Sequence, residues 1–224
     1  MKKVLIIVAA LLVTVFLCTF MTRNQVGKLP TELNQEISQY LVYVKGIAHS
    51  GSGVVVKSDE KGSLILTNKH VCGPHKLTDD VKQYFGNIPS YIMLLTYNKT
   101  TAIAQPMKVA INSDLCLLHT IQTNLEVAPI AKYPVKTGES LFTCGNPLGL
   151  KGLCYDGYAA DFKYIFFMLY RGTTVPARPG QSGSGIFNVH GELVGLVSLG
   201  LPGGAYSAMV PLSHIKLFLA GIEL

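Results

Sequence analysis

The chain has 224 residues, of which 49% are hydrophobic and only 14% are charged, and its formal net charge is +6. So high an apolar fraction excludes intrinsic disorder. The basic excess lies at one end, because four basic residues precede the first acidic residue, Glu32: Lys2, Lys3, Arg23 and Lys28. The rest of the chain holds 15 basic and 13 acidic residues. A nucleic-acid binder is therefore not expected, since it would need basic residues gathered on a folded face.

An uncharged apolar run covers residues 4–21 and follows the Lys2–Lys3 pair. Its 18 residues exceed the roughly 7 to 15 of a cleaved signal-peptide core and approach the ~20 that cross hydrocarbon. No small-x-small cleavage site follows. We expect residues 1–21 to be an uncleaved transmembrane anchor, with a cleaved signal peptide as the alternative, and residues 22–39 to be a polar tether. The lysine pair predicts that the rest of the chain lies outside the cytoplasm, on the periplasmic or extracellular side.

From residue 40 onward, short β-branched and aliphatic runs alternate with turn residues. They predict strands at 40–44, 53–56, 64–67, 91–97, 115–120, 140–144, 164–170, 185–188, 193–198 and 205–210. Hairpin turns are expected at 57–62 and 189–192, and one late helix at 213–220. Because no crossover helices separate the strands, the pattern favours an all-β barrel or sandwich over a parallel α/β sheet. The run 164–170 is too short to span a membrane and is expected to be a core strand.

Four cysteines follow the apolar run, an even number in a chain that we expect to be exported, so disulfides are permitted. Cys144 and Cys154 flank a turn-rich stretch, and strands on either side of that turn would pair them. The alternative is two buried free thiols. Whether Cys72 and Cys116 also form a disulfide is a question that the sequence leaves open. No Cys-x-x-Cys or His-x-x-x-His spacing occurs, so neither a metal nor another cofactor is expected.

The strongest chemical signal is the stretch at residues 179–185, Pro-Gly-Gln-Ser-Gly-Ser-Gly, just before an apolar strand. A nucleophile needs an exposed hydroxyl on a tightly turned backbone whose N–H groups can point at an oxyanion, and glycines permit that turn. Ser182, two residues after Gly180 and directly before Gly183, meets this description. Alone, the stretch is equally consistent with an ordinary Gly/Ser loop.

Two other segments supply partners for such a serine. His70 comes directly after the strand predicted at 64–67, and Asp114 opens the strand predicted at 115–120. A histidine that exchanges a proton with serine needs a buried carboxylate on its other ring nitrogen. The chain order His, Asp, Ser, and Ser184 where a G-x-S-x-G motif needs glycine, both argue against an α/β-hydrolase.

These segments together resemble the motifs of trypsin-like (chymotrypsin-fold) serine proteases, and within them those of the HtrA/Deg branch. The matching stretches are 51–56, 66–71, 114–118, 145–149, 179–185 and 195–200. The resemblance implies two six-stranded antiparallel β-barrels over residues 40–224, with a short C-terminal helix. It assigns Ser182 as nucleophile, His70 as general base and then acid, and Asp114 as the group that orients His70. The N–H groups of Gly180 and Ser182 would form the oxyanion hole. Ser184 is the rival nucleophile.

The resemblance also bears on specificity and assembly. Because the sequence ends at Leu224, no PDZ domain is expected. The walls of the S1 pocket are expected at 173–179 and 198–200, and neither stretch holds a carboxylate, so an aliphatic or small P1 residue is expected rather than Arg or Lys. The expected substrate-binding residues are Pro176, Ser198, Leu199 and Gly200.

The sequence therefore predicts a membrane-anchored serine endopeptidase that acts on proteins or peptides outside the cytoplasm. The alternative is a protease-fold binding or chaperone-like protein whose activity is vestigial. The sequence leaves the oligomeric state open, and a homotrimer, as in HtrA relatives, is one option.

Overall fold

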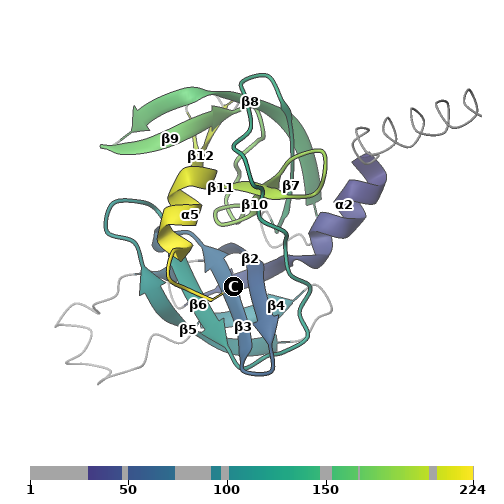
Figure 1. Ribbon diagram of the computed structural model, residues 1–224, viewed down its shortest axis with the longest axis vertical. Coiled ribbons are helices and arrows are strands. Elements are labelled where there is room, and N and C mark those ends of the chain that lie inside the picture. The colour runs from purple at the N-terminus through teal and green to yellow at the C-terminus, as the bar shows by residue number, and fades with distance from the viewer. Residues whose placement is uncertain are drawn as a thin grey trace, which may run out of the picture.

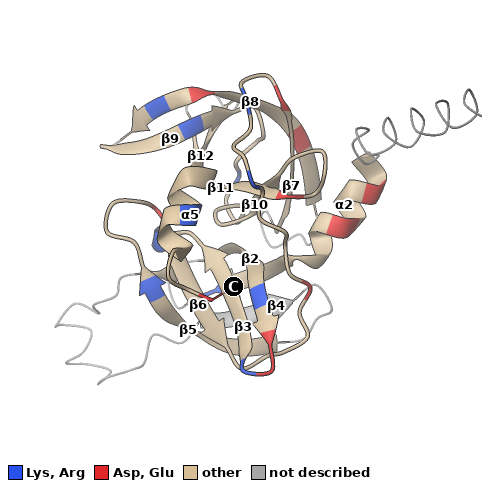
Figure 2. Ribbon diagram, in the orientation of Figure 1, with Lys and Arg blue, Asp and Glu red and all other residues tan. Residues whose placement is uncertain are grey.

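The computed structural model describes residues 30–46, 50–73, 92–96, 101–146, 153–165, 167–201 and 206–223, with the backbone alone for 92–96. Two antiparallel β-barrels lie one above the other in Figure 1. Helix α2 (Pro30–Gln39) lies on one side of the pair, and helix α5 (Leu212–Leu219) on the other. Basic and acidic residues are interspersed along the ribbon of both barrels in Figure 2, as expected from their near balance after residue 29.

The amino-terminal barrel closes in the order β1-β2-β3-β6-β5-β4. Its strands are β1 (Leu41–Lys45), β2 (Ser50–Asp59), β3 (Gly62–Thr67), β4 (Ile92–Thr96), β5 (Thr101–Val109) and β6 (Cys116–Thr120). Neighbouring strands are antiparallel throughout, and the β1–β4 pair closes the barrel. Strand β5 was not predicted, because Pro106 interrupts its pattern; the structure accommodates that proline at a register shift against β6.

The carboxy-terminal barrel closes in the order β10-β11-β12-β9-β8-β7. Its strands are β7 (Ser140–Gly145), β8 (Leu153–Ile165), β9 (Met168–Thr173), β10 (Gly185–Phe187), β11 (Leu193–Gly200) and β12 (Ser207–Pro211). Helix α5 follows β12 directly. Both predicted hairpins form, as the β2–β3 and β10–β11 turns. The all-β fold and its C-terminal helix are thus confirmed, and both barrels are closed.

Alternation of side chains along the strands explains why the barrels pack together. Val55 and Ile65 lie in the cluster inside the amino-terminal barrel. Leu64 and Leu66, on the opposite face of the same strand as Ile65, lie in a larger cluster that includes Phe187 of the other barrel. One apolar face of such a strand therefore lines the interior of its barrel, and the other face packs in the interface between the two barrels.

Residues 30–39 form helix α2, whereas the sequence predicted a polar tether there. Pro30 suits the first turn of a helix, where its missing N–H costs nothing. Leu33 and Ile37, four residues apart and so on one face, are both 0% exposed. Helix α2 contacts β7, as Figure 1 shows. The prediction failed because two apolar residues in a polar stretch become a buried face only once β7 is present.

The predicted core strand at 164–170 is also wrong. The chain reverses at Phe167, whose φ is +64°, so the run is divided between the ends of β8 and β9. Tyr164 is 72% exposed and Phe167 is 102% exposed, while Tyr170 alone of the described aromatics in this run is buried. The sequence of an apolar run does not show which of its residues will be buried in the folded protein.

The membrane anchor predicted at 1–21, and the first part of the tether, lie outside the described residues. Within residues 30–223, apart from the gaps given above, the structure contains no helix of the length and apolar character needed to cross a bilayer.

Candidate active site

The three residues predicted to perform chemistry come from both barrels. His70 lies in the one-turn helix α3 (Lys69–Cys72) after β3, and Asp114 lies in the bend before β6. Strands β3 and β6 are paired, with Thr67 opposite Cys116, so their adjoining segments are neighbours. Ser182 lies in the turn before β10 of the other barrel.

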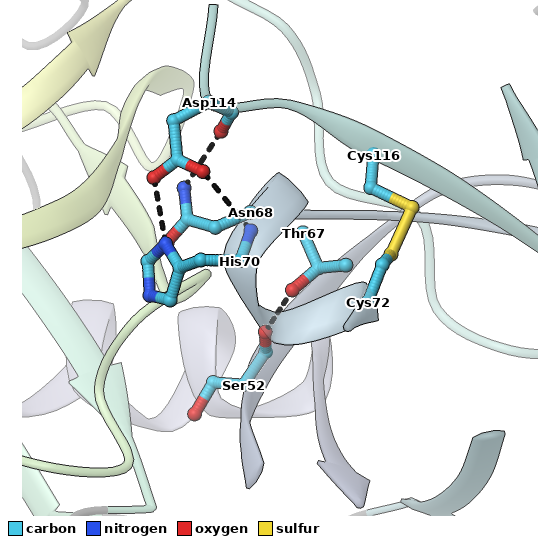
Figure 3. Close-up of a disulfide and its surroundings, with 7 residues drawn as sticks. All are labelled: Ser52, Thr67, Asn68, His70, Cys72, Asp114 and Cys116. Atoms are coloured by element: carbon cyan, nitrogen blue, oxygen red, sulfur yellow. Dashed lines mark hydrogen bonds and ion pairs between the residues drawn. A yellow bond between two sulfur atoms is a disulfide. The ribbon is translucent and has the colours of Figure 1, made fainter. Parts of the chain in front are cut away.

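His70 and Asp114 are joined by two hydrogen bonds. The ring Nδ1 of His70 lies 2.9 Å from Oδ2 of Asp114, and the main-chain N–H of His70 donates to Oδ1 at 3.2 Å. Asn68 donates from Nδ2 to the main-chain oxygen of Asp114 at 3.0 Å, as Figure 3 shows. Because a carboxylate only accepts, Nδ1 carries the proton of this hydrogen bond, and in the neutral form of the ring Nε2 presents a lone pair.

Asp114 is buried and ionised. It is 7% exposed, and burial alone would raise its pKa. The hydrogen bonds and positive charge of His70, together with the hydroxyl of Ser198, outweigh that effect and hold the pKa of Asp114 below its ordinary value. Ser198 donates from Oγ to Oδ2 at 2.5 Å. The substrate-binding role predicted for Ser198 stays a prediction; in the structure its side chain contacts the acid of the site.

Ser182 is half-buried, and its Oγ donates to the main-chain oxygen of Ser198 at 3.4 Å. Within the described part of the chain, no hydrogen bond joins Ser182 to His70; such bonds are often long before substrate binds. Ser198 touches both Asp114 and Ser182. The structure therefore brings the three predicted residues together around one serine of β11.

A tight turn precedes Ser182. The N–H of Gln181 donates to the oxygen of Arg178 at 2.9 Å, and the N–H of Arg178 donates back to Oε1 of Gln181 at 2.8 Å. Pro179 occupies the second position of this turn, and Gly180, at φ +94°, the third. A positive φ at the third position defines a type II turn and favours glycine there.

The turn leaves two backbone donors free. Gly183 donates its N–H to the oxygen of Val197, and Ser184 donates its N–H to that of Gln181, each at 2.9 Å. Among the described residues, the N–H groups of Gly180 and Ser182 have no acceptor. These are the two groups that the sequence assigned to the oxyanion hole. Ser184, the rival nucleophile, is 0% exposed.

Ser52 of β2 connects this turn to the amino-terminal barrel, and sequence reasoning did not single it out. Its N–H donates to the oxygen of Ser182 at 2.8 Å, and its Oγ donates to the oxygen of Gly180 at 2.9 Å. Its own oxygen accepts from Oγ1 of Thr67 at 2.7 Å. The available signal was its place between two glycines: a Cβ on Gly51 would lie 2.6 Å from the oxygen of Ser182.

The two predicted pocket walls face each other. A Cβ on Gly200 would lie 3.1 Å from the main-chain oxygen of Ala177, so the end of β11 approaches the 173–179 stretch. Pro176 and Leu199 are half-buried, and Gly200 is exposed.

Both cysteine pairs form disulfides. Cys144 and Cys154 lie opposite each other on β7 and β8 and are bonded, which confirms the prediction. Cys72 and Cys116, whose pairing the sequence left open, are also bonded. In the described segments, no group of three or more His, Cys, Asp or Glu residues is arranged to hold a metal ion.

The comparisons with known proteins point in one direction. The family model for the trypsin-like peptidase domain matches residues 51–196. A "Serine protease HtrA-like" of Staphylococcus haemolyticus is 31% identical over 168 residues, which cover 66% of this chain and 24% of that protein. A "Serine protease HTRA2, mitochondrial" of Drosophila grimshawi is 28% identical over 181 residues, which cover 77% of this chain and 39% of that one. The chain thus spans only part of the curated relatives it matches.

Solved structures agree. The serine endoprotease from Yersinia pestis superposes with a TM-score of 0.66 at 26% identity, over 85% of this chain and 66% of that one. The inactive form of Rv3671c from Mycobacterium tuberculosis superposes with a TM-score of 0.67 at 15% identity, over 88% of this chain and 95% of that one, and shares the fold.

Proposed function

The chain belongs to the trypsin-like peptidase family, and from that premise we propose that it is a serine endopeptidase that hydrolyses peptide bonds in proteins or peptides. The observation that carries the proposal is the 2.9 Å contact between Nδ1 of His70 and Oδ2 of Asp114. It lies beside a half-buried serine and two unused backbone donors, which is the set of groups that acyl transfer needs.

In the first half of the reaction, Oγ of Ser182 attacks the scissile carbonyl carbon while Nε2 of His70 takes the hydroxyl proton. Asp114 keeps the other ring nitrogen protonated and stabilises the imidazolium that forms. The N–H groups of Gly180 and Ser182 donate to the oxyanion of the tetrahedral intermediate. His70 then returns its proton to the leaving amine, and an acyl-enzyme on Ser182 remains.

In the second half, water attacks the acyl carbon and gives its proton to His70. The carboxyl product leaves, and the proton returns to Oγ of Ser182. Ser198 supports both halves, because its hydroxyl donates to Asp114 and its main-chain oxygen accepts from Ser182.

The preferred P1 side chain in this proposal is aliphatic or small. The 173–179 and 198–200 walls carry no carboxylate, and Arg178 is the one charged residue in them. An Arg or Lys side chain at P1 would therefore meet no opposite charge, and a peptide series with Ala, Val or Leu against Arg at P1 tests this. A ratio of kcat/KM in favour of Arg would overturn the assignment.

We extend the proposal to location: residues 4–21 hold the domain at a membrane, with the barrels outside the cytoplasm. Its support is the length of the uncharged run and the Lys2–Lys3 pair. N-terminal sequencing of membrane and soluble fractions tests it. Recovery of the protein solely in the soluble fraction with its N-terminus near residue 22 would replace the anchor with a cleaved signal peptide.

The test of the activity is Ser182→Ala in the full chain, with Ser184→Ala as the matched control. We expect Ser182→Ala to lower kcat on casein or an apolar peptide by about 10⁴-fold or more. Ser184→Ala should stay within about threefold, because its buried hydroxyl has no partner among the described residues and its removal leaves no group unpaired.

A fluorophosphonate probe gives a second readout. We expect an adduct on Ser182 in the wild type and in Ser184→Ala, and none in Ser182→Ala. A folded wild-type protein that forms no adduct and cleaves no peptide would instead favour the binding or chaperone-like role.

A further inference from the structure

The Cys72–Cys116 disulfide lies beside the pair of residues that would move the proton. Cys72 comes two residues after His70 at the end of α3, and Cys116 comes two residues after Asp114 at the start of β6. Figure 3 shows the bridge and the His70–Asp114 hydrogen bonds side by side. The two segments are thus joined twice, once by a covalent bond and once by the contacts of the site.

The backbone of the His70 segment makes few hydrogen bonds of its own, although the neighbouring Val71 is buried in the amino-terminal barrel. Helix α3 has four residues and begins without a side-chain cap from Asn68. Its described backbone bonds are those from the N–H groups of Val71 and Cys72 to the oxygen of Asn68, at 3.2 and 3.3 Å. One helical turn is far below the roughly 12 residues at which a helix is stable by itself. Its position therefore depends on what it is attached to.

The segment that carries Asp114 is held more firmly. Strand β6 pairs along its whole length with β3, and with β5 on its other side. The main-chain oxygen of Asp114 accepts from Asn68, and its carboxylate accepts from Ser198. A bond from Cys116 to Cys72 therefore attaches a single helical turn to a strand that is paired on both sides.

The disulfide is itself enclosed. Cys72 is 6% exposed and Cys116 is 0% exposed, in the interior cluster of the amino-terminal barrel with Val44, Ile65 and Leu118. Its sulfur atoms are held by close packing on all sides, so the bond does not swing as an exposed one would. By contrast His70 itself is exposed, with 46% of its side-chain surface accessible.

We propose that the Cys72–Cys116 disulfide is a positioning element of the active site, which holds the imidazole of His70 against the carboxylate of Asp114. The inference rests on the proposed peptidase function and assigns a part of its geometry to a covalent bond. Without the bond, α3 shifts relative to β6 and the 2.9 Å contact is no longer maintained. A misplacement of about 1 Å in such a group can cost about 10²-fold in rate.

The experiment compares the full chain with Cys72→Ala/Cys116→Ala, and uses Cys144→Ala/Cys154→Ala, which removes the other disulfide, as the matched control. We expect the first variant to lose about 10- to 100-fold in kcat, with KM within about twofold because the pocket walls lie in the other barrel. The control should lose less than about threefold in kcat.

A readout that does not depend on turnover separates this inference from the proposed function. The proton that Nδ1 of His70 shares with Asp114 gives a far-downfield resonance in proton NMR. We expect this resonance in the wild type and in the control, and its loss or broadening in Cys72→Ala/Cys116→Ala. A wild type that shows the resonance but cleaves nothing would defeat the peptidase proposal and leave the positioning role to be decided by the resonance.

If Cys72→Ala/Cys116→Ala folds poorly, the inference is tested by a second measurement, on folded protein that keeps both cysteines. In the Cys144→Ala/Cys154→Ala background, Cys72–Cys116 is the remaining described disulfide. Because it is buried, the protein is unfolded in guanidinium so that dithiothreitol reaches the bond, reduces it to two thiols and becomes a cyclic disulfide, and the protein is then refolded with dithiothreitol present. Mass spectrometry follows the reduction, and the resonance and kcat should fall in step with it. Unchanged kcat and an unchanged resonance in either the reduced protein or the folded variant would overturn the inference.

Discussion

Helix α2 gives a direct test of whether residues 30–39 belong to the folded domain. Leu33 is 0% exposed and lies near the β10–β11 turn, where its Cδ1 would be 3.4 Å from a Cβ on Gly191. A Leu→Ala change at a fully buried site removes the transfer energy of the lost atoms and leaves a cavity, at a cost of about 2–5 kcal/mol. For a domain of this size, each kcal/mol lowers the melting temperature by about 2–4 °C. Taking about 3 kcal/mol, Leu33→Ala should lower it by about 6–12 °C.

The assay is thermal unfolding of the full chain followed by circular dichroism, with Gln39→Ala as the control on the exposed side of the same helix. Exposed substitutions away from such contacts stay within about 0.5 kcal/mol, so the control should shift by less than about 2 °C. A shift as small for Leu33→Ala as for Gln39→Ala would refute the packing of α2 and restore the tether.

Two further predictions concern the site. A Cβ on Gly183, at φ +85°, would meet the oxygen of Ser52 and Oγ1 of Thr67, whereas a Cβ on Gly138, at φ +87°, would meet nothing within 4 Å. Gly138→Ala should therefore cost about 1–2 kcal/mol in urea unfolding and Gly183→Ala at least about 3, and equal costs would contradict the close approach. Since the folded pKa of Asp114 lies below its ordinary value of 3.8, its stabilising effect is complete above that pH and is lost as pH falls through the folded pKa. An acid titration of unfolding should thus be less steep below pH 3.8 in Asp114→Asn than in the wild type, and parallel curves would exclude the effect.

The proposed catalytic residues could be predicted from the sequence because each lies next to the end of a strand. His70 after one strand, Asp114 before another, and Ser182 in a glycine-rich turn keep their local contexts whatever the exact register. The motif stretches that supported the family resemblance are local too. Short segments of this kind carry their own backbone requirements, above all the positive φ at Gly180, so the residue types alone reveal them.

Contacts made across the fold could not be read in this way. The sequence offered Cys72 and Cys116 as one option, but the pairing follows from Thr67 standing opposite Cys116, a register that no local pattern states. Ser198 was assigned to the substrate because its strand was recognised, whereas the direction of its side chain depends on Asp114 arriving from the other barrel.

The division of the site between two barrels has a consequence for the time at which it appears. The segments that carry His70 and Asp114 both belong to the amino-terminal barrel, whereas Ser198, Ser182 and the two free N–H groups are fixed only when β10 to β12 have joined the second barrel. The turn at Ser182 is held in addition by Ser52. A chain still being synthesised therefore holds His70 and Asp114 before Ser182, the proposed nucleophile, is fixed beside them. If the domain acts as the proposed peptidase, it is therefore inactive until the second barrel has folded.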